Sequence, residues 1–443
     1  MTDLVLRGGT VVLPGVLGQR ADVAIEDGLI AAIVPELEGP AREELDARGL
    51  HVLPGAIDAH VHFNEPGRAE WEGWASGTAA LAAGGATACV EMPLNAHPPT
   101  VDGAALDAKV AAARRAACVD FALWGGLVPG DIDRLDELAA RGVVGFKAFM
   151  CDTGVDDFAA VDDDTLGAGM ARAAALGLPV AVHAEAPARL SAPQGSDWRA
   201  WAASRPPEAE LEAIERALAL AQQTGCSLHV VHVSTGAGVA RVAEARARGV
   251  DASCETCPHH LTLTEEDMER LGTAAKCAPP LRAASERDAL WEQLAAGRVA
   301  LVASDHSPCP PAMKAGDYAA AWGGIAGAQT TLCLLLDEGH HRRGLPLAPL
   351  VALLTEAPAA RLGLRKGRLE PGADADLALV DLRAEHELRR GDLHDRHRAN
   401  PFIGRPLRAR VVRTLLRGRT VFAGGRVVAE PLGRLITPTR GTA

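Results

Sequence analysis

The sequence is poor in aromatic residues and in lysine. Aromatic side chains make up 3% of its 443 residues, Tyr318 is its single tyrosine, and five of its 45 basic residues are lysines. It also lacks apolar runs of 18 residues or more, and no basic region with an apolar core follows Met1. Such segments mark transmembrane helices and signal peptides. We therefore expect a cytoplasmic protein.

Clusters of positive charge are missing as well. The formal net charge is -12 at pH 7, and no stretch of the chain is rich in lysine and arginine together. Nucleic acids and anionic membranes both select for clustered basic residues. The composition therefore argues against either as a partner.

The cysteines show no disulfide framework. There are nine of them, an odd number, and most occur singly, as Cys89 and Cys226 do. This distribution suits reduced thiols. Cys254 and Cys257 have the spacing of a zinc-binding pair, but no second pair accompanies them, so we interpret their segment as a strand.

The middle of the chain alternates strand-like apolar runs with helical segments. The runs cover residues 51–63, 86–93, 120–127, 144–150, 179–185, 227–234, 250–258 and 299–306. Helical spacing or composition marks 104–117, 208–224 and 284–296. Eight such repeats predict an α/β protein built on a (β/α)8 TIM barrel. The alternative, an open doubly wound sheet, lacks a glycine-rich dinucleotide fingerprint after its first strand.

Short alternating runs occupy both ends of the chain. Near the N-terminus, Asp27-Gly28 separates two such runs and predicts a tight hairpin. Similar runs recur at 375–381, 411–416 and 420–428. Because the first block is too short to bury a core alone, we expect the two blocks to complete one another as a small β-sandwich. The predicted domains are 53–364 for the barrel, with 1–52 and 365–443 as the two parts of the sandwich.

A barrel places its functional groups at the C-terminal ends of its strands. His60 and His62 end the first predicted strand and, two positions apart, face the same side. Later strands bring four more groups to the same rim: Lys147, His183, His232 and Asp305. Each one alone is more often a hydrogen-bonded structural residue. Together, four imidazoles and a carboxylate are costly to bury without a purpose, and they favour a metal site.

Lys147 is the most informative of these residues. It lies within an apolar strand, residues 143–150. An ammonium group buried beside metal ions is unfavourable, so its pKa should fall and the amine should become neutral. A neutral amine can add carbon dioxide to form a carbamate, which is an anion able to bridge two cations.

Motifs over essentially the whole length resemble those of the cyclic amidohydrolases of the urease-related superfamily, and within it those of the allantoinases. The matching segments are HVHFNEPG at 60–67, WEG at 71–73, EMPLN at 91–95, GFKAF at 145–149, VHAE at 182–185, HVVHVS at 229–234, CPH at 257–259, KCAPP at 276–280 and SDHSPCPP at 304–311. The resemblance implies a hydrolase that opens small cyclic amides.

The resemblance also assigns the metal ligands. His60 and His62 would hold one metal ion, with Asp305 as a further ligand. His183 and His232 would hold a second, and carboxylated Lys147 would bridge the pair. His229 is the alternative to His232, but it is three positions away and should face away from the barrel interior.

Further expectations follow from the same resemblance. It implies a homotetramer and two divalent metal ions, for which zinc suits the ligands and cobalt, manganese, nickel or iron are alternatives. A metal-bridging hydroxide would attack the ring amide of a small neutral ureide, with Asp305 as general base and then general acid. Asn95, Cys277 and Ser307 lie in strand-end loops and are candidates for substrate contact.

Two relatives and one unrelated class remain as alternatives. Dihydroorotases usually carry an arginine where this chain has Asn64, to pair with a substrate carboxylate. Hydantoinases and dihydropyrimidinases use a tyrosine shortly after the carboxylated lysine, where this chain has Cys151 and Asp152. A non-catalytic scaffold would typically have lost metal ligands, whereas all six positions are present. The departures at Asn64 and at Cys151 and Asp152 favour allantoin as the substrate, with its hydantoin ring opened to allantoate.

The segment 187–205 has two interpretations. It contains Trp198 and Trp201 and separates a predicted strand from a predicted helix. Long connections of this kind are usually functional. We expect it to form either a lid over the site or a contact between subunits.

Overall fold

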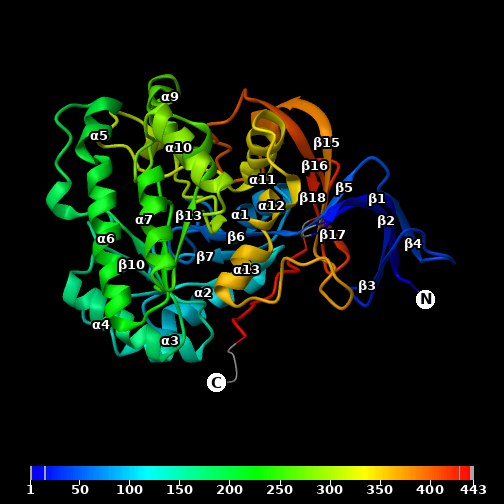
Figure 1. Ribbon diagram of the computed structural model, residues 1–443, viewed down its shortest axis with the longest axis horizontal. Helices are drawn as coiled ribbons and strands as arrows, with labels where there is room; N and C mark the ends of the chain where they lie inside the picture. The colour runs from blue at the N-terminus through cyan, green and yellow to red at the C-terminus, as the bar shows by residue number, and fades with distance from the viewer. Residues whose placement is uncertain (1, 14–15, 429, 440–443) are drawn as a thin grey trace.

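A nine-stranded sheet joins the two ends of the chain in the computed structural model, which describes residues 2–13, 16–428 and 430–439. Its strands are β1 (Leu4–Leu13), β2 (Val16–Glu26), β3 (Leu29–Val34), β4 (Glu43–Asp46), β5 (His51–Pro54), β15 (Leu377–Glu387), β16 (Pro406–Leu416), β17 (Arg419–Ala423) and β18 (Arg426–Val427). The order is β18-β17-β16-β15-β5-β1-β2-β3, with β4 beside β1. N-terminal and C-terminal strands lie side by side at the right of Figure 1.

The antiparallel pairing of β5 with β15 joins the two terminal blocks, as the sequence predicts. Leucine, valine and isoleucine side chains from both blocks form one core cluster, which includes Leu6, Val23, Ile25, Val52 and Leu377. Each block therefore covers apolar surface that the other leaves exposed.

The predicted hairpin is confirmed. Strands β2 and β3 pair from Glu26 and Leu29 onwards, so Asp27 and Gly28 form a two-residue turn. Both have positive φ, 51° and 80°. This conformation matches the twist of the flanking strands and favours Asp-Gly.

Parallel strands make up the middle of the chain. The strands β6 (Ala56–Val61), β7 (Ala86–Glu91) and β8 (Asp120–Leu123) form one sheet. The second sheet contains β9 (Gly125–Gly126), β10 (Phe146–Phe149), β11 (Val180–His183), β12 (Leu228–Val230), β13 (Ala252–Thr256) and β14 (Leu301–Val302). Every neighbouring pair within both sheets is parallel. Each of the eight predicted runs contains at least one of these strands.

Two details differ from the predicted strands. The run 51–63 is two strands, because β5 belongs to the terminal sheet and β6 to the parallel one. Gly55 separates them, and a Cβ at this position would lie 2.2 Å from the Thr87 hydroxyl, so only glycine fits there. The run 120–127 is interrupted at Trp124, which divides β8 from β9.

Helices flank the parallel strands on the left and in the centre of Figure 1. They are α1 (Trp74–Ala83), α2 (Gly103–Ala116), α3 (Arg134–Ala140), α4 (Asp163–Ala175), α5 (Trp198–Ser204), α6 (Pro207–Thr224), α7 (Gly236–Ala247), α8 (Pro258–Thr262), α9 (Glu265–Leu271), α10 (Ala284–Ala295), α11 (Thr331–Leu335), α12 (Leu347–Ala352) and α13 (Glu356–Leu362). The three predicted helices correspond to α2, α6 and α10 within one residue at each end.

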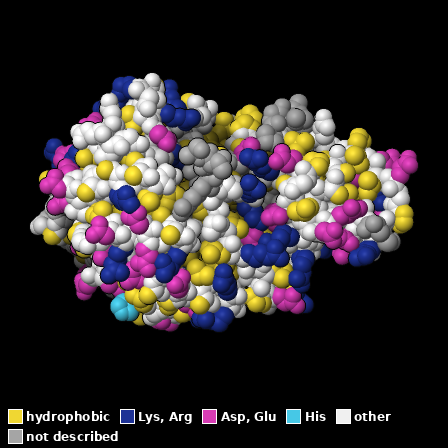
Figure 2. Space-filling view, turned by 90° about the horizontal axis from the view of Figure 1, so that it is seen from below, with side chains coloured by type: hydrophobic (Ala, Val, Ile, Leu, Met, Phe, Trp, Pro, Cys, Tyr) yellow, Lys and Arg dark blue, Asp and Glu magenta, His cyan; other side chains and the backbone are white. Residues whose placement is uncertain are grey.

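The outer surface carries charges of both signs. Figure 2 shows acidic and basic side chains interspersed over the face seen from below. All nine cysteines lie among the described residues, where they are buried and free, as expected for reduced thiols. Among the described helices, none combines the length and apolar character needed to cross a membrane.

A buried lysine ties the parallel sheet to the terminal sheet. The ammonium group of Lys366 lies 2.6 Å from Asp120, 2.6 Å from Asp374 and 2.8 Å from Asp376. Asp120 begins β8, and Asp376 precedes β15. One cation therefore neutralises carboxylates from both parts of the molecule.

Candidate active site

The six groups predicted on the rim lie on or just after five of the parallel strands. His60 lies on β6 and His62 directly follows it, Lys147 lies on β10, and His183 is the last residue of β11. His232 and Asp305 follow β12 and β14 by two and three residues. The four imidazoles and the Asp305 carboxylate line a single cavity of about 560 Å³. The amine of Lys147 is not part of this lining.

The first group of ligand atoms is centred on Asp305. Its carboxylate oxygen lies 3.2 Å from His60 Nε2 and 3.4 Å from His62 Nε2. Burial opposes ionisation, but the neighbouring imidazoles hold the pKa of Asp305 well below its usual range. This arrangement of two imidazoles and an ionised carboxylate is a suitable ligand set for a divalent transition metal.

The second group contains His183 and His232. His183 Nδ1 lies 3.1 Å from His232 Nε2, and both rings are buried. Burial lowers the pKa of both, which favours the neutral form that binds metals. The His60 and His232 rings lie 5.5 Å apart between centroids, so the two groups adjoin.

Lys147 lies beside both groups with a fully buried side chain. Its Nζ lies 4.0 Å from the centroid of the Phe149 ring. Burial lowers the pKa of this amine to about 7, although Asp305 and Glu255 oppose the shift. At neutral pH a large share of the amine is therefore unprotonated and nucleophilic.

Backbone strain concentrates at the same rim. His232 and Asp305 have φ values of 39° and 46°, and Asn64 and Asn95 have 64° and 70°. Residues other than glycine rarely adopt positive φ, and such residues often occur at functional sites. The chain thus turns sharply just past the strand ends, and the side chains of His232, Asp305 and Asn95 line the cavity there.

Carboxylates behind the rim orient the histidines, and the sequence analysis did not identify them. Glu255 Oε1 lies 2.5 Å from His60 Nδ1, and Glu185 Oε2 lies 2.6 Å from His183 Nε2. Arg205 in turn pairs with Glu185. These contacts leave Nε2 of His60 and Nδ1 of His183 pointing to the rim. A glutamate two residues after His183, in the VHAE motif, was the available signal for one of them.

His229 is also part of this network. Its Nε2 lies 3.0 Å from Glu255 Oε2, and its Nδ1 lies 2.8 Å from the Ser253 hydroxyl. The expectation that His229 faces away from the interior is therefore wrong. It shares a carboxylate with His60, whereas His232 contacts His183 directly.

The predicted substrate contacts differ in placement. Asn95 and Ser307 line the cavity. Cys277 is buried outside the lining, although its neighbours Lys276 and Ala278 are part of it. The Cys277 carbonyl accepts a hydrogen bond from Trp201 Nε1 at 3.1 Å.

The segment 187–205 forms part of the cavity wall. It contains α5, and its residues Leu190, Trp201 and Arg205 line the cavity. Lys276 Nζ lies 4.1 Å from the centroid of the Trp201 ring. This position fits the lid interpretation, and the contact between subunits stays a prediction.

The residues that discriminate between relatives are also located. Asn64 is buried and its amide donates to the Pro308 carbonyl at 3.4 Å. Asp152 lines the cavity, whereas Tyr318 is not among the described residues that line it.

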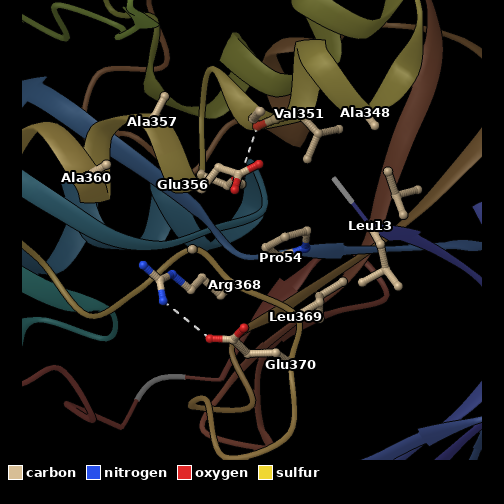
Figure 3. A pocket seen from close by; sticks show the side chains of 14 residues that line it. Leu13, Pro54, Ala348, Val351, Glu356, Ala357, Ala360, Arg368, Leu369 and Glu370 are labelled. Carbon is tan, nitrogen blue, oxygen red and sulfur yellow. Dashed lines mark hydrogen bonds and ion pairs between the residues drawn. The ribbon is translucent and has the colours of Figure 1, made fainter. Parts of the chain in front are cut away.

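A second hollow of about 400 Å³ lies between α12, α13 and the terminal sheet (Figure 3). Leu13, Pro54 and Val351 contribute apolar surface to it, and Arg368 pairs with Glu370 at its edge. None of the six rim groups lies in it.

Known proteins similar to this chain share its full length. The model of the amidohydrolase family matches residues 51–421. The allantoinase of Rubrobacter xylanophilus is 62% identical, over 99% of this chain and 98% of that protein, and the allantoinase of Solibacter usitatus is 52% identical, over 100% and 98%. The structure of an L-hydantoinase (dihydropyrimidinase) from Arthrobacter aurescens superposes with a TM-score of 0.95 at 34% identity, covering 99% of this chain and 100% of that one.

Proposed function

Since the chain belongs to the amidohydrolase family and is a hydrolase of cyclic amides, we propose that it opens the hydantoin ring of allantoin to give allantoate. The observation that carries the proposal is the convergence of His60, His62, His183, His232 and Asp305 on one cavity, with Lys147 behind them. Such a set has the chemistry of a hydrolytic metal centre.

The proposal includes a (β/α)8 barrel over residues 53–364. Trp124 alone separates β8 from β9, and a parallel bridge between Val61 and His306 links the strand ends of β6 and β14. The one-residue gap and the bridge both support closure of the two parallel sheets into one barrel. Residues 1–52 and 365–443 would form the β-sandwich, and the enzyme would be a cytoplasmic homotetramer.

Members of the amidohydrolase family generally bind divalent metals, and the rim residues fit such ions. His60, His62 and Asp305 would hold one ion, His183 and His232 the other, and a carbamate on Lys147 would lie between them. Zinc suits these ligands best, with cobalt, manganese, nickel or iron as alternatives. When bound, the ions would lower the pKa of water and polarise the amide carbonyl.

Asp305 would carry the protons. Its carboxylate is ionised, lines the cavity and is 13% exposed. It would accept the proton of the attacking water and deliver it to the departing ring nitrogen, as a carboxylate within reach of both atoms can.

Ring selection would depend on the charge of the cavity wall. Allantoin is neutral, and Asn64 offers no cation to pair with the carboxylate of dihydroorotate. Asp152 lines the wall where the hydantoinases and dihydropyrimidinases use a tyrosine. Dihydroorotase and hydantoinase activities are the alternative functions, and Asn64 and Asp152 argue against them.

A substrate panel tests this proposal. Purified protein loaded with zinc and bicarbonate is incubated separately with allantoin, dihydroorotate, dihydrouracil and hydantoin, and ring opening is followed. We expect the highest kcat/KM with allantoin. Preferential opening of another ring would reject the substrate assignment and preserve the hydrolytic class, whereas no opening of any ring would reject both.

A further inference from the structure

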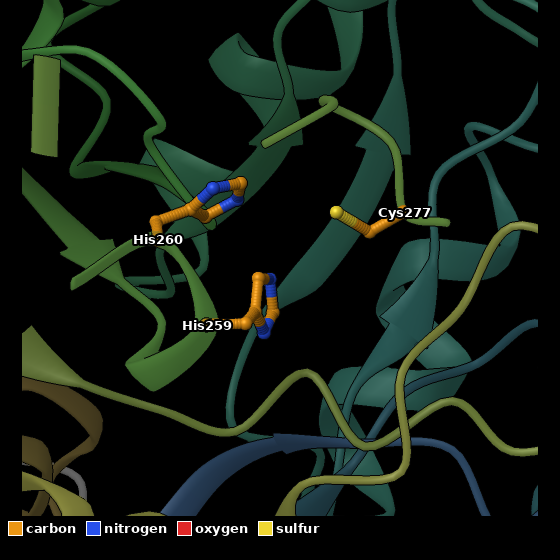
Figure 4. Close-up of side chains that lie close together, drawn as sticks. All are labelled: His259, His260 and Cys277. Atoms are coloured by element: carbon orange, nitrogen blue, oxygen red, sulfur yellow. The ribbon is translucent and has the colours of Figure 1, made fainter. Parts of the chain in front are cut away.

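A second cluster of metal-binding side chains lies behind the cavity wall. His259 and His260 belong to α8, and Cys277 follows the short helical turn Gly272–Ala275. One ligand atom from each residue lies within 4.8 Å of the other two. Figure 4 shows the three side chains pointing into one common space.

The imidazoles of this cluster have no partners among the described residues. His259 Nε2 and both ring nitrogens of His260 are buried without a hydrogen bond. The two rings lie 4.4 Å apart between centroids. Buried polar atoms are nearly always satisfied, so adjacent unsatisfied nitrogens indicate an absent partner.

We propose that His259, His260 and Cys277 bind a third transition-metal ion of the zinc class. Two imidazoles and one thiolate form a nitrogen and sulfur ligand set that selects such ions over magnesium or calcium. Donor atoms in a tetrahedral zinc site lie about 3.3–3.8 Å apart, given metal–ligand bonds of about 2.0–2.3 Å. The three donors lie within 4.8 Å of one another, so metal binding would require the side chains to rotate closer together.

The protonation states of the two imidazoles fit this role. Burial lowers the pKa of His259 to about 4 and that of His260 well below its usual value, so both imidazoles are neutral. Burial raises the pKa of the Cys277 thiol to about 12, so the thiol is protonated until a metal ion displaces its proton. Metal binding would break the S–H bond, form the S–metal bond and release one proton to solvent, without redox change.

Both negatively and positively charged groups surround the cluster. Asp305 acts on both imidazoles as an anion, and Arg282 acts on His260 as a cation. Lys314 and Arg282 act on Cys277 as cations, and Asp305 acts on it as an anion. An ionised Cys277 would therefore supply the cluster's own negative charge to a divalent ion. The flanking residues Lys276 and Ala278 line the cavity, so an ion bound here would stiffen the wall that Trp201 also contacts.

Cobalt(II) provides the test, because a thiolate ligand gives a sulfur-to-cobalt charge-transfer band in the near ultraviolet. The six rim groups contain no sulfur, so this readout is independent of turnover and of the proposed function. Metal-stripped protein is titrated with cobalt(II), and bound metal per chain is counted. We expect the band to appear and three ions to bind per chain.

Two cysteine variants locate the band. Cys277→Ser should abolish it, and Cys151→Ser should retain it. Cys151 is the matched control because its thiol lies near His183 and Glu185 and offers the competing thiolate. A band that is lost in Cys151→Ser and kept in Cys277→Ser overturns the proposal, as does the lack of any band in the parent protein.

A third variant and a measurement on the unaltered chain cover misfolding. His260→Gln should weaken cobalt binding at the band-forming site by at least about tenfold, as expected for loss of a ligand. X-ray absorption of the zinc-loaded parent protein should show a sulfur neighbour at about 2.3 Å. Unchanged affinity in the variant, or zinc with only nitrogen and oxygen neighbours, contradicts the assignment.

Discussion

Glu255 accepts hydrogen bonds from two histidines on different strands: its carboxylate oxygens lie 2.5 Å from His60 Nδ1 and 3.0 Å from His229 Nε2. The three residues are buried. Because Nδ1 of His60 is engaged, Nε2 is fixed towards Asp305. Glu255 is thus a positioning residue for the rim.

We predict that Glu255→Gln weakens metal binding by about 10–100-fold, the usual effect of losing a carboxylate behind a metal-bound histidine. Competition with a chelator measures the affinity. Glu210→Gln is the matched control, since Glu210 is also buried but bonds Ser234 and Thr235 instead of histidines. Equal losses in the two variants would show that Glu255 acts through general stability and not through His60.

The wall segment provides a second prediction. Trp201→Phe keeps an aromatic ring but removes the hydrogen bond to the Cys277 carbonyl. We therefore expect KM for allantoin to rise about 2–10-fold with little change in kcat. Trp198→Phe is the control, because Trp198 Nε1 has no partner among the described residues. Steady-state kinetics of both variants measure the effect, and an equal KM in the two would argue that this segment is no lid.

The third prediction concerns the contribution of Lys366 to the free energy of unfolding. Lys366→Met leaves the carboxylates of Asp120, Asp374 and Asp376 around a neutral side chain, and we expect a loss of about 3–5 kcal/mol. Urea unfolding measures the change. Lys366→Arg, which keeps the charge, should lose less, and a loss as large as in Lys366→Met would assign the effect to packing.

The same lysine has a defined pH dependence. Burial opposes its charge, but Asp376 and Asp120 raise the pKa of Lys366 above its ordinary value. Its stabilising contribution is therefore complete below the unfolded-state pKa of about 10.4 and is lost as the pH rises through the folded-state pKa. The stability difference between the parent protein and Lys366→Met should be constant from about pH 7 to about pH 10 and shrink only above it. Shrinkage already below about pH 9 would be incompatible with the raised pKa.

Local patterns identified most of the strands and the residues of the rim. Alternation of apolar runs and helices is a periodic signal, so it locates the eight strand-forming runs and the helices α2, α6 and α10. His60 and His62 are recognisable because two positions on a strand share a face. Their convergence with Asp305 then follows from the shared edge of the parallel strands.

The missing parts depend on contacts between distant residues. Glu255 lies 195 positions from His60, and no local pattern in the sequence links the two residues. Lys366 is a single lysine in a connection, and nothing nearby in sequence indicates that it meets Asp120. The sequence predicts one strand over residues 51–63 because β5 and β6 are both apolar and only Gly55 separates them.

The dependence of ring opening on metal and on Lys147 tests the account most directly. Stripped parent protein should have no allantoin turnover, and zinc with bicarbonate should restore it, whereas Lys147→Ala should regain little or none. Lys109→Ala is not a suitable control, because Lys109 is paired with Glu91. The second variant is therefore Lys147→Arg, which retains a cation but cannot form the carbamate. Turnover by the stripped protein, or full restoration in either variant, would contradict the account.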